Sequence, residues 1–241
     1  MHVPTQPQVT PFTGFPPETL RFLRALARHN DRTWFEAHAE DYEHHVGQPS
    51  RAFVWSLGLK LARLVPGLVA DPRAHGIGSI SRLQRDTRFA KDKTPYRTHL
   101  GILFWQGRLP GKWDNPGFHV AISATQLTLT GGLRTFPPPT RAAWREAVCH
   151  GGRRRALRRA LEQAPDDLLL GGRTYKRGPR GLLATADNED LLRHSGLFLT
   201  HTENHAEKTP PSLHTADLVD HCASVFRGMA PVVQWLAKLP G

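Results

Sequence analysis

Residues 117–133 read Gly-Phe-His-Val-Ala-Ile-Ser-Ala-Thr-Gln-Leu-Thr-Leu-Thr-Gly-Gly-Leu, two short runs of period-2 character joined by Ala124-Thr125. Such runs are typical of β-strands, because successive side chains of a strand point to opposite faces. We therefore expect strands at 117–123 and 126–133.

Similar short runs precede this pair, after Gly76-Ile-Gly-Ser ends the helical spacing of the N-terminal third. They predict strands at 80–89 and 98–106, with turns at 91–95 and 110–116. Consecutive short strands favour an antiparallel meander with helices segregated to its face. The expected fold class is therefore α+β with a central, mainly antiparallel sheet, not a doubly wound parallel sheet.

Helical spacing of apolar residues lies on both sides of the predicted sheet. An N-terminal helical layer is expected from three helices: one from Pro17 to Asn30, one capped by Asp31, and one that ends at Pro66-Gly67. After the sheet we expect helices at 140–148, 153–163, 188–194 and 215–239, a loop at 171–181 and a strand-like run at 197–201. Residues 1–11 are a Pro-containing flexible lead, and 12–241 form a single domain in this prediction.

The composition argues against a disulfide-rich, zinc-finger or membrane protein. Cys149 and Cys222 stand alone, in neither a disulfide-rich nor a zinc-finger spacing, so a reducing compartment is favoured. No N-terminal leader pattern and no run of about 18 apolar residues occurs, which argues against a membrane protein. We expect a cytoplasmic protein. The sequence indicates neither a cofactor nor an oligomeric state.

The formal net charge of +11 is concentrated in two central segments. Residues 73–112 hold nine Lys and Arg against two acidic residues, and residues 134–180 hold twelve against four. Positive charge gathered in this way attracts nucleic acid or a small phosphorylated ligand. The alternative is a basic surface that only keeps the protein dissolved. The Arg-rich run 153–159 also has an ordinary apolar stripe, so a surface helix is favoured there.

The segment from Arg82 to Arg97 is the densest group of chemically active side chains. If 80–89 is a strand, Arg85 points to the more apolar side, where its charge needs a carboxylate or a ligand. Guanidinium and ammonium groups of the following loop suit a phosphate. The candidate ligand-binding residues here are Arg82, Arg85, Arg88, Lys93, Tyr96 and Arg97.

Two further positions complete the predicted binding set. Arg134 follows Gly131-Gly132, where backbone N–H groups could approach an anion, although a Gly pair at a strand end is more often a bulge or turn. Arg180 lies in Lys176-Arg-Gly-Pro-Arg-Gly, a constrained loop that could cover a phosphate or face solvent.

Three functions remain open from these residues. The first is binding of a phosphate-bearing ligand, with nucleic acid among the candidates. The second is a metal-dependent phosphoester hydrolase in which Asp86 and Asp92 hold the metal, Lys93 stabilises charge and Tyr96 orients substrate. The third is a docking module for an acidic protein partner. Asp86 and Asp92 could also simply pair with neighbouring cations and pin the loop, so the sequence does not decide whether the protein is an enzyme.

Other catalytic motifs are absent: the sequence has no GxSxG, GxxxxGK[ST], GxGxxG or HExxH. His201-Thr-Glu-Asn-His205 places two histidines four residues apart, but outside any expected helix, so no metal site is predicted. His99 and His119 lie on adjoining predicted strands, where they could meet across the sheet.

Several motifs together resemble a known family. They are Phe12-Thr-Gly-Phe-Pro-Pro-Glu, Leu23 to Phe35 with its Asn30-Asp31, the run Ser81 to Arg97, Gly117-Phe-His-Val and Lys176-Arg-Gly-Pro-Arg-Gly. The chain is similar over nearly its whole length to the bacterial and fungal family catalogued as domain of unknown function 2461. This resemblance implies one cytosolic domain and carries over no activity. Gln84 departs from the aromatic or aliphatic residue expected in the family pattern.

Overall fold

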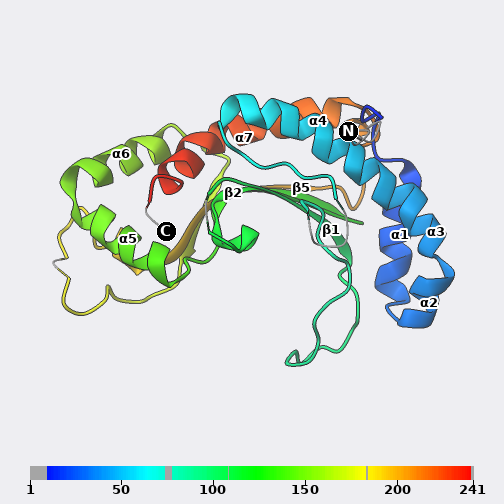
Figure 1. The fold of residues 1–241 in the computed structure, drawn as a ribbon, viewed down its shortest axis with the longest axis horizontal. Helices are drawn as coiled ribbons and strands as arrows, with labels where there is room; N and C mark the ends of the chain where they lie inside the picture. The colour runs from blue at the N-terminus through cyan, green and yellow to red at the C-terminus, as the bar shows by residue number, and fades with distance from the viewer. Residues whose placement is uncertain (1–9, 74–77, 108, 183, 240–241) are drawn as a thin grey trace, which may run out of the picture.

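The computed structural model describes residues 10–73, 78–107, 109–182 and 184–239. Most of the flexible lead predicted at 1–11 lies outside these residues. Helices gather at both ends of an antiparallel sheet, and two long helices run over its upper side in Figure 1. The predicted α+β class is confirmed.

The sheet has five strands in the described residues, in the order β1-β2-β3-β5-β4, and all neighbours are antiparallel. The strands β1 (His99–Trp105), β2 (Gly117–Ser123) and β3 (Gln126–Leu133) form the expected meander. β5 (His194–Asn204) then pairs with β3, and β4 (Leu169–Arg173) pairs with the outer side of β5.

Helices occupy the two flanks. The N-terminal side holds α1 (Pro17–Arg28), α2 (Arg32–Ala37), α3 (Ala39–Tyr42), a π-helical turn at Glu43–Gly47, and α4 (Gln48–Leu64). The other side holds α5 (Pro138–Cys149) and α6 (Gly151–Glu162), and α7 (Asp217–Leu236) ends the chain's regular structure. Short 3₁₀ turns lie at Lys112–Asp114, Leu191–Arg193 and Pro211–His214. Within the described residues no helix is long and apolar enough to cross a membrane.

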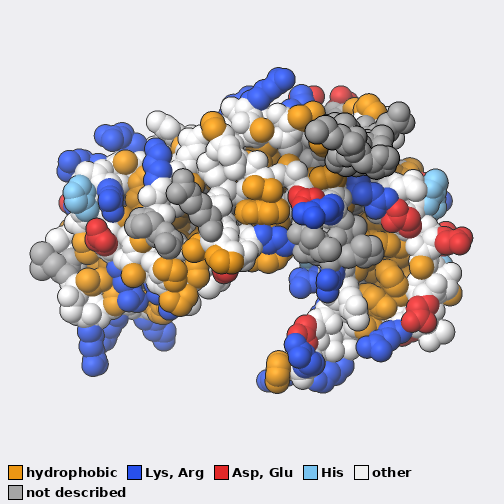
Figure 2. Space-filling view, viewed as in Figure 1, with side chains coloured by type: hydrophobic (Ala, Val, Ile, Leu, Met, Phe, Trp, Pro, Cys, Tyr) orange, Lys and Arg blue, Asp and Glu red, His pale blue; other side chains and the backbone are white. Residues whose placement is uncertain are grey.

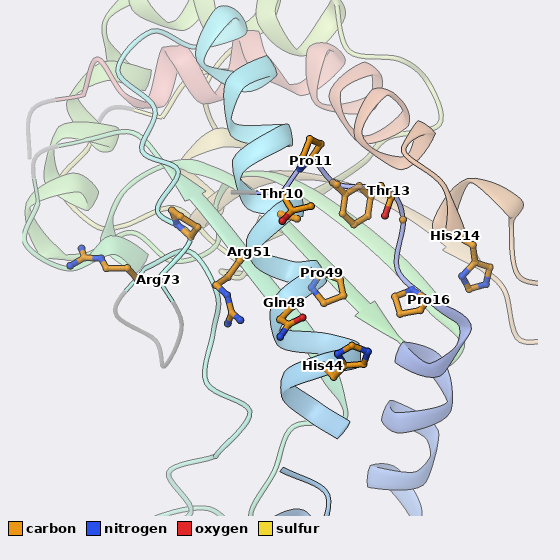
Figure 3. Close-up of a pocket in the computed structure, with 14 residues that line it drawn as sticks. Thr10, Pro11, Thr13, Pro16, His44, Gln48, Pro49, Arg51, Arg73 and His214 are labelled. Carbon is orange, nitrogen blue, oxygen red and sulfur yellow. The ribbon is translucent and has the colours of Figure 1, made fainter. Parts of the chain in front are cut away.

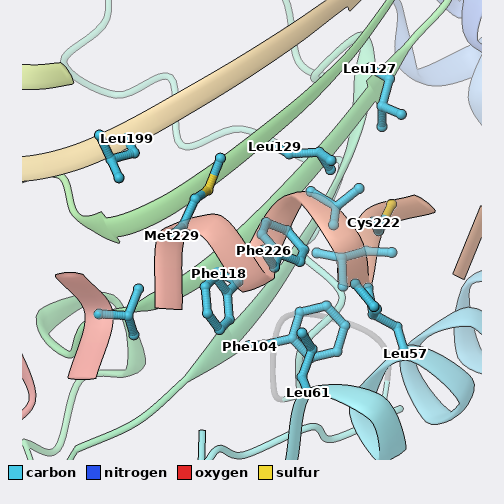
Figure 4. Close-up of a cluster of buried hydrophobic side chains, with 14 of the residues drawn as sticks. Leu57, Leu61, Phe104, Phe118, Leu127, Leu129, Leu199, Cys222, Phe226 and Met229 are labelled. Carbon is cyan, nitrogen blue, oxygen red and sulfur yellow. The ribbon is translucent and has the colours of Figure 1, made fainter. Parts of the chain in front are cut away.

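The hydrophobic core lies between one face of the sheet and the pair α4 and α7. Figure 4 shows Phe226 and Met229 of α7 against Phe118, with Leu57 and Leu61 of α4 nearby. The rings of Phe118 and Phe226 are 4.7 Å apart, and both side chains are fully buried. The alternation predicted for β2 and β3 therefore places one set of side chains in this core and leaves the other set on the opposite face.

Gly131 shows why the Gly pair of β3 stands where it does. A Cβ atom at Gly131 would lie 2.7 Å from the Cβ of Met229, closer than side chains pack. Gly132 has a φ of +136°, which other residues rarely adopt. Gly131 thus lets α7 approach β3 closely, and Gly132 leaves room for the backbone of β5 at Leu197 and Phe198.

The strand expected at 80–89 is wrong. Ile80 and Gln84 make only isolated bridges, to Ile102 and Tyr96, and the chain leaves the sheet between them. Ile80 and Leu83 are buried, whereas the polar residues that follow have no apolar face to pack. Residues 82–97 form instead a protruding arm below β1, visible in Figure 1.

Two smaller elements also differ from the prediction. β4 lies where a loop was expected, because it is an exposed, Gly-containing edge strand with little hydrophobic signal. The helix expected at 188–194 is a 3₁₀ turn of three residues, Leu191–Arg193.

Candidate functional site

The arm, residues 82–97, is fastened at its base to the N-terminal helices. Asn30 accepts a hydrogen bond from the Tyr96 N–H and donates one to the Tyr96 carbonyl, both at 2.9 Å. The Tyr96 ring is buried and stacks on Phe35, with the ring centroids 4.4 Å apart. Tyr96 therefore anchors the arm, a structural task, at the position where the sequence suggested a ligand contact.

Ion pairs within the arm occupy four of its eight predicted site residues. Arg85 Nη1 lies 2.5 Å from Asp92 Oδ2 and also donates to Thr94, and Arg88 Nη2 lies 2.7 Å from Asp86 Oδ2. Hydrogen bonds from the Thr94 backbone, then from Arg85 and the Thr94 hydroxyl, lower the pKa of Asp92 to about 2. The geometry agrees with the alternative in which these carboxylates pin the loop.

Lys93 is also used within the arm: its Nζ donates to the carbonyls of Thr87 and Arg88 at 3.0 and 3.3 Å. Asp86 and Asp92 each have an arginine partner of their own, and no other protein group joins the two carboxylates into one site among the described residues. Their metal-binding role stays a prediction.

A cavity of about 450 Å³ lies on the sheet face opposite α7, and we call it the sheet basin. It is lined by residues of β1, β2 and β3, by Ser81 just before the arm, by Arg97 at the end of the arm, by Trp113 and by Arg134. Figure 2 shows the molecule hollowed between the arm and the α5–α6 end, with Lys and Arg side chains on both sides. Of the predicted ligand-binding residues, Arg97 and Arg134 line this basin, and Arg180 lies on the separate loop before Leu191.

The sheet face that carries the basin holds four buried polar groups without partners among the described residues; His119 and Ser81 line the basin itself, and Thr130 and Thr200 continue the same face across β3 and β5. His119, Thr130 and Thr200 lie directly opposite one another on β2, β3 and β5. His119 Nδ1, the hydroxyls of both threonines and the Ser81 hydroxyl are buried, and none has a hydrogen-bond partner among the described residues. Each such group costs about 1–3 kcal/mol when left unpaired. A bound polar ligand or water would recover that cost.

Gly101 makes room for two of these groups. A Cβ atom at Gly101 would lie 3.2 Å from His119 Nε2 and 3.4 Å from Ser81 Oγ. His99 lies two residues before it on the same face, so the two predicted histidines both line the basin without being direct cross-strand partners.

The electrostatics of the basin favour an anion. Burial of the ring is the main cause that lowers the pKa of His119 to about 4, and the charge of Arg134, then His99 and Arg97, lowers it further. Burial, followed by the charge of Arg97, also lowers the pKa of His99. Among the described residues neither Arg97 nor Arg134 has an ion-pair partner, while Arg134 lies over the Phe198 ring at 5.1 Å.

His119 gives a testable pH dependence. Its pKa is lower in the fold than its ordinary value of 6.5, so the unfolded chain takes up more protons as the pH falls. The free energy of unfolding should therefore decrease from about pH 6.5 to about pH 4, by at most about 3 kcal/mol from this group. Denaturant titrations of His119→Gln at several pH values should show a shallower decrease. A His44→Gln control, at an exposed site, should keep the wild-type slope; equal slopes for His119→Gln and wild type would contradict the placement of His119.

A larger cavity, of about 690 Å³, lies between the segment before α1, the start of α4 and Pro72-Arg73 (Figure 3). Its two arginines are already paired, Arg51 with Glu43 and Arg73 with Asp71. No buried side-chain polar atom without a partner lies in its described lining. A polar ligand bound in this cavity would therefore satisfy fewer unpaired protein groups than a ligand bound in the sheet basin.

The Arg-rich helix α6 has the buried apolar stripe that the sequence predicted. Leu157 and Ala160 are the buried side chains of α6. On its outer side Arg154 pairs with Asp187 at 3.4 Å, and Arg158 pairs with Asp190 at 2.6 Å. Part of the positive charge counted in the sequence is thus neutralised locally.

Sequence comparisons agree with the motifs. Residues 18–235 match a family described as "Conserved hypothetical protein (DUF2461)", the family that the motifs resemble. None of the curated proteins searched matches the chain.

Proposed function

The chain belongs to the family of conserved hypothetical proteins DUF2461, and we propose that it binds a phosphate-bearing ligand in the sheet basin. The observation that carries this proposal is that two buried polar groups lining the basin, His119 Nδ1 and the Ser81 hydroxyl, have no hydrogen-bond partner among the described residues. Beside them lie Arg97 and Arg134, neither of which forms an ion pair with a described residue. Phosphate oxygens accept hydrogen bonds from guanidinium and hydroxyl groups, and charge-assisted hydrogen bonds of this kind are the strong ones.

The histidine at the floor suits the same ligand. With its pKa lowered to about 4, His119 is neutral at pH 7, so one ring nitrogen donates and the other accepts. An anion beside Arg97 and Arg134 would offset the positive charge that lowers this pKa.

An aromatic ring lies at the edge of the basin. Trp113 is 51% exposed, and its ring centroid is 5.6 Å from that of His119. An exposed indole beside a phosphate site can stack on a planar group of the ligand, such as a nucleobase. The ligand class that fits is therefore a nucleotide, either free or within a nucleic-acid strand.

Fluorescence polarisation with a labelled single-stranded oligonucleotide, competed by unlabelled nucleoside monophosphates and by inorganic phosphate, tests the proposal. We expect saturable binding that weakens as the salt concentration rises. Competition by a monophosphate would assign the basin to a free nucleotide, and binding of the oligonucleotide that neither competitor displaces would assign it to nucleic acid. Failure of all three probes to bind at low salt would contradict the proposal.

Salt dependence gives a second criterion. Each phosphate that the protein neutralises contributes a slope of roughly −0.7 to −0.9 to log K against log salt. With Arg97 and Arg134 in the basin, the expected slope is about −1 to −2. A slope near zero would exclude phosphate recognition by these two cations.

A further inference from the structure

Three potential metal ligands meet outside the sheet basin, on the opposite side of the sheet. His201 and Glu203 are two residues apart on β5, so both side chains point to the face that α7 covers. His221 comes from α7. The pairing of β4 with β5 begins at Leu169 and Thr200, so among the described strands the end of β5 that carries His201 and Glu203 pairs with β3 alone.

The ligand atoms are close enough for one ion. Glu203 Oε1 lies 2.5 Å from His221 Nε2 and 3.1 Å from His201 Nε2, and one ligand atom of each residue lies within 4.8 Å of the others. Ligands at about 2.0–2.2 Å from zinc stand roughly 3.3 Å apart in a tetrahedral shell. Small side-chain rotations would therefore bring all three atoms onto a central ion.

A fourth residue orients one of the histidines. Asp167 Oδ2 lies 3.1 Å from His201 Nδ1. A carboxylate on the far nitrogen of a histidine is the usual arrangement behind a metal ligand, because it holds the proton on Nδ1 and leaves the Nε2 lone pair for the ion.

A neutral His201 ring has fewer N–H donors than its two carboxylate neighbours can accept from. Asp167 and Glu203 present an acceptor oxygen to each of its two nitrogens, whereas a neutral imidazole has one N–H to donate. A cation in place of the Glu203 contact would satisfy the second nitrogen as a ligand. The alternative is a doubly protonated His201 held between two carboxylates.

The geometry points to a divalent transition-metal site formed by His201, Glu203 and His221, with Asp167 as the positioning residue. Two imidazoles and one carboxylate are ligands that zinc accepts. The three side chains are partly exposed, at 19, 24 and 35%, so water can complete the coordination shell. Cys222, the neighbour of His221, is fully buried and is not among the three residues whose ligand atoms converge.

Calorimetric titration of the EDTA-treated full chain with Zn²⁺ tests this site. We expect one equivalent to bind with a Kd of about 1 µM or lower, and the thermal midpoint to rise with bound zinc. His221→Gln and His201→Gln should each weaken binding at least about 100-fold. A His44→Gln control, which removes an exposed histidine elsewhere, should bind as the wild type does. Binding that is absent, or equal in His221→Gln and wild type, would overturn the site.

Two measurements do not depend on the folding of ligand variants. Asp167→Asn changes an exposed side chain that touches no metal, and it should weaken zinc binding about 10- to 100-fold. Co²⁺ bound to the wild-type chain should give visible d–d absorption without the intense near-ultraviolet band of a thiolate ligand. A thiolate band, or an unchanged affinity in Asp167→Asn, would overturn the proposed ligand set.

Discussion

The double variant Arg97→Gln/Arg134→Gln is expected to bind the phosphate-bearing ligand at least about 100-fold more weakly than wild type. Both guanidinium groups line the sheet basin without an ion-pair partner among the described residues. A hydrogen bond to a charged group contributes about 1.5–3 kcal/mol, so the loss of two exceeds the 2.7 kcal/mol of a 100-fold change. Fluorescence polarisation with the tightest probe measures the difference.

A matched control separates the basin from the general positive charge. Arg24→Gln/Arg28→Gln removes the same charge from exposed positions of α1, and it should change affinity less than about threefold at physiological salt. Equal losses in the two double variants would mean that binding follows net charge alone, and the basin would not be the site.

Phe226→Ala should destabilise the protein by about 3–5 kcal/mol. Phe226 is fully buried on α7, and its ring packs against Phe118 in the core between α7 and the sheet. Truncation of a buried aromatic residue loses its transfer free energy and leaves a cavity. Guanidinium or thermal unfolding followed by circular dichroism measures the loss.

The neighbouring residue provides the control for that variant. Arg227 is exposed on the same helix, so Arg227→Ala should shift the free energy of unfolding by less than about 0.5 kcal/mol. A loss of less than about 1 kcal/mol in Phe226→Ala would contradict the packing of α7 on β2 and β3.

The strands of the sheet centre could be predicted because their sequence alternates and their turns are short. The ranges expected for β2 and β3, 117–123 and 126–133, match the structure residue for residue. The arm could not be predicted in the same way. Its Arg, Asp and Lys residues alternate as a strand would, and near the base Arg85 and Arg97 donate backbone hydrogen bonds to Pro95 and Leu83. The polar residues beyond have no apolar face to pack, and ion pairs such as Arg85 with Asp92 hold them instead.

Several residues of the sheet basin could be singled out from the sequence, but not the basin itself. Arg97, Arg134, His99 and His119 each stood out in the sequence, but as separate residues, because the register that brings them to one face depends on strand pairing. Thr130 was missed, since a threonine on a strand has an ordinary β-propensity and only the structure shows its hydroxyl buried without a partner.

The proposed metal site could not be predicted from the sequence either, because its three ligands meet through strand alternation and helix packing. The sequence spacing drew attention to His201 and His205, but His205 turns to the carbonyl of Ser123. The alternation of a strand instead pairs His201 with Glu203 on one face. His221 joins them only through the packing of α7 on the sheet, a contact that no local pattern encodes.

Ligand binding in the sheet basin is tested most directly by imidazole NMR of the histidines, followed between pH 4 and pH 7 with and without saturating nucleoside monophosphate. His119 Nδ1 is buried beside Arg97 and Arg134 at the floor of the basin. The proposal predicts that the His119 resonances shift with saturation and that its pKa rises from about 4 towards 6.5, while the exposed His44 stays unchanged. Saturating ligand that leaves both His119 and His99 unmoved would contradict it.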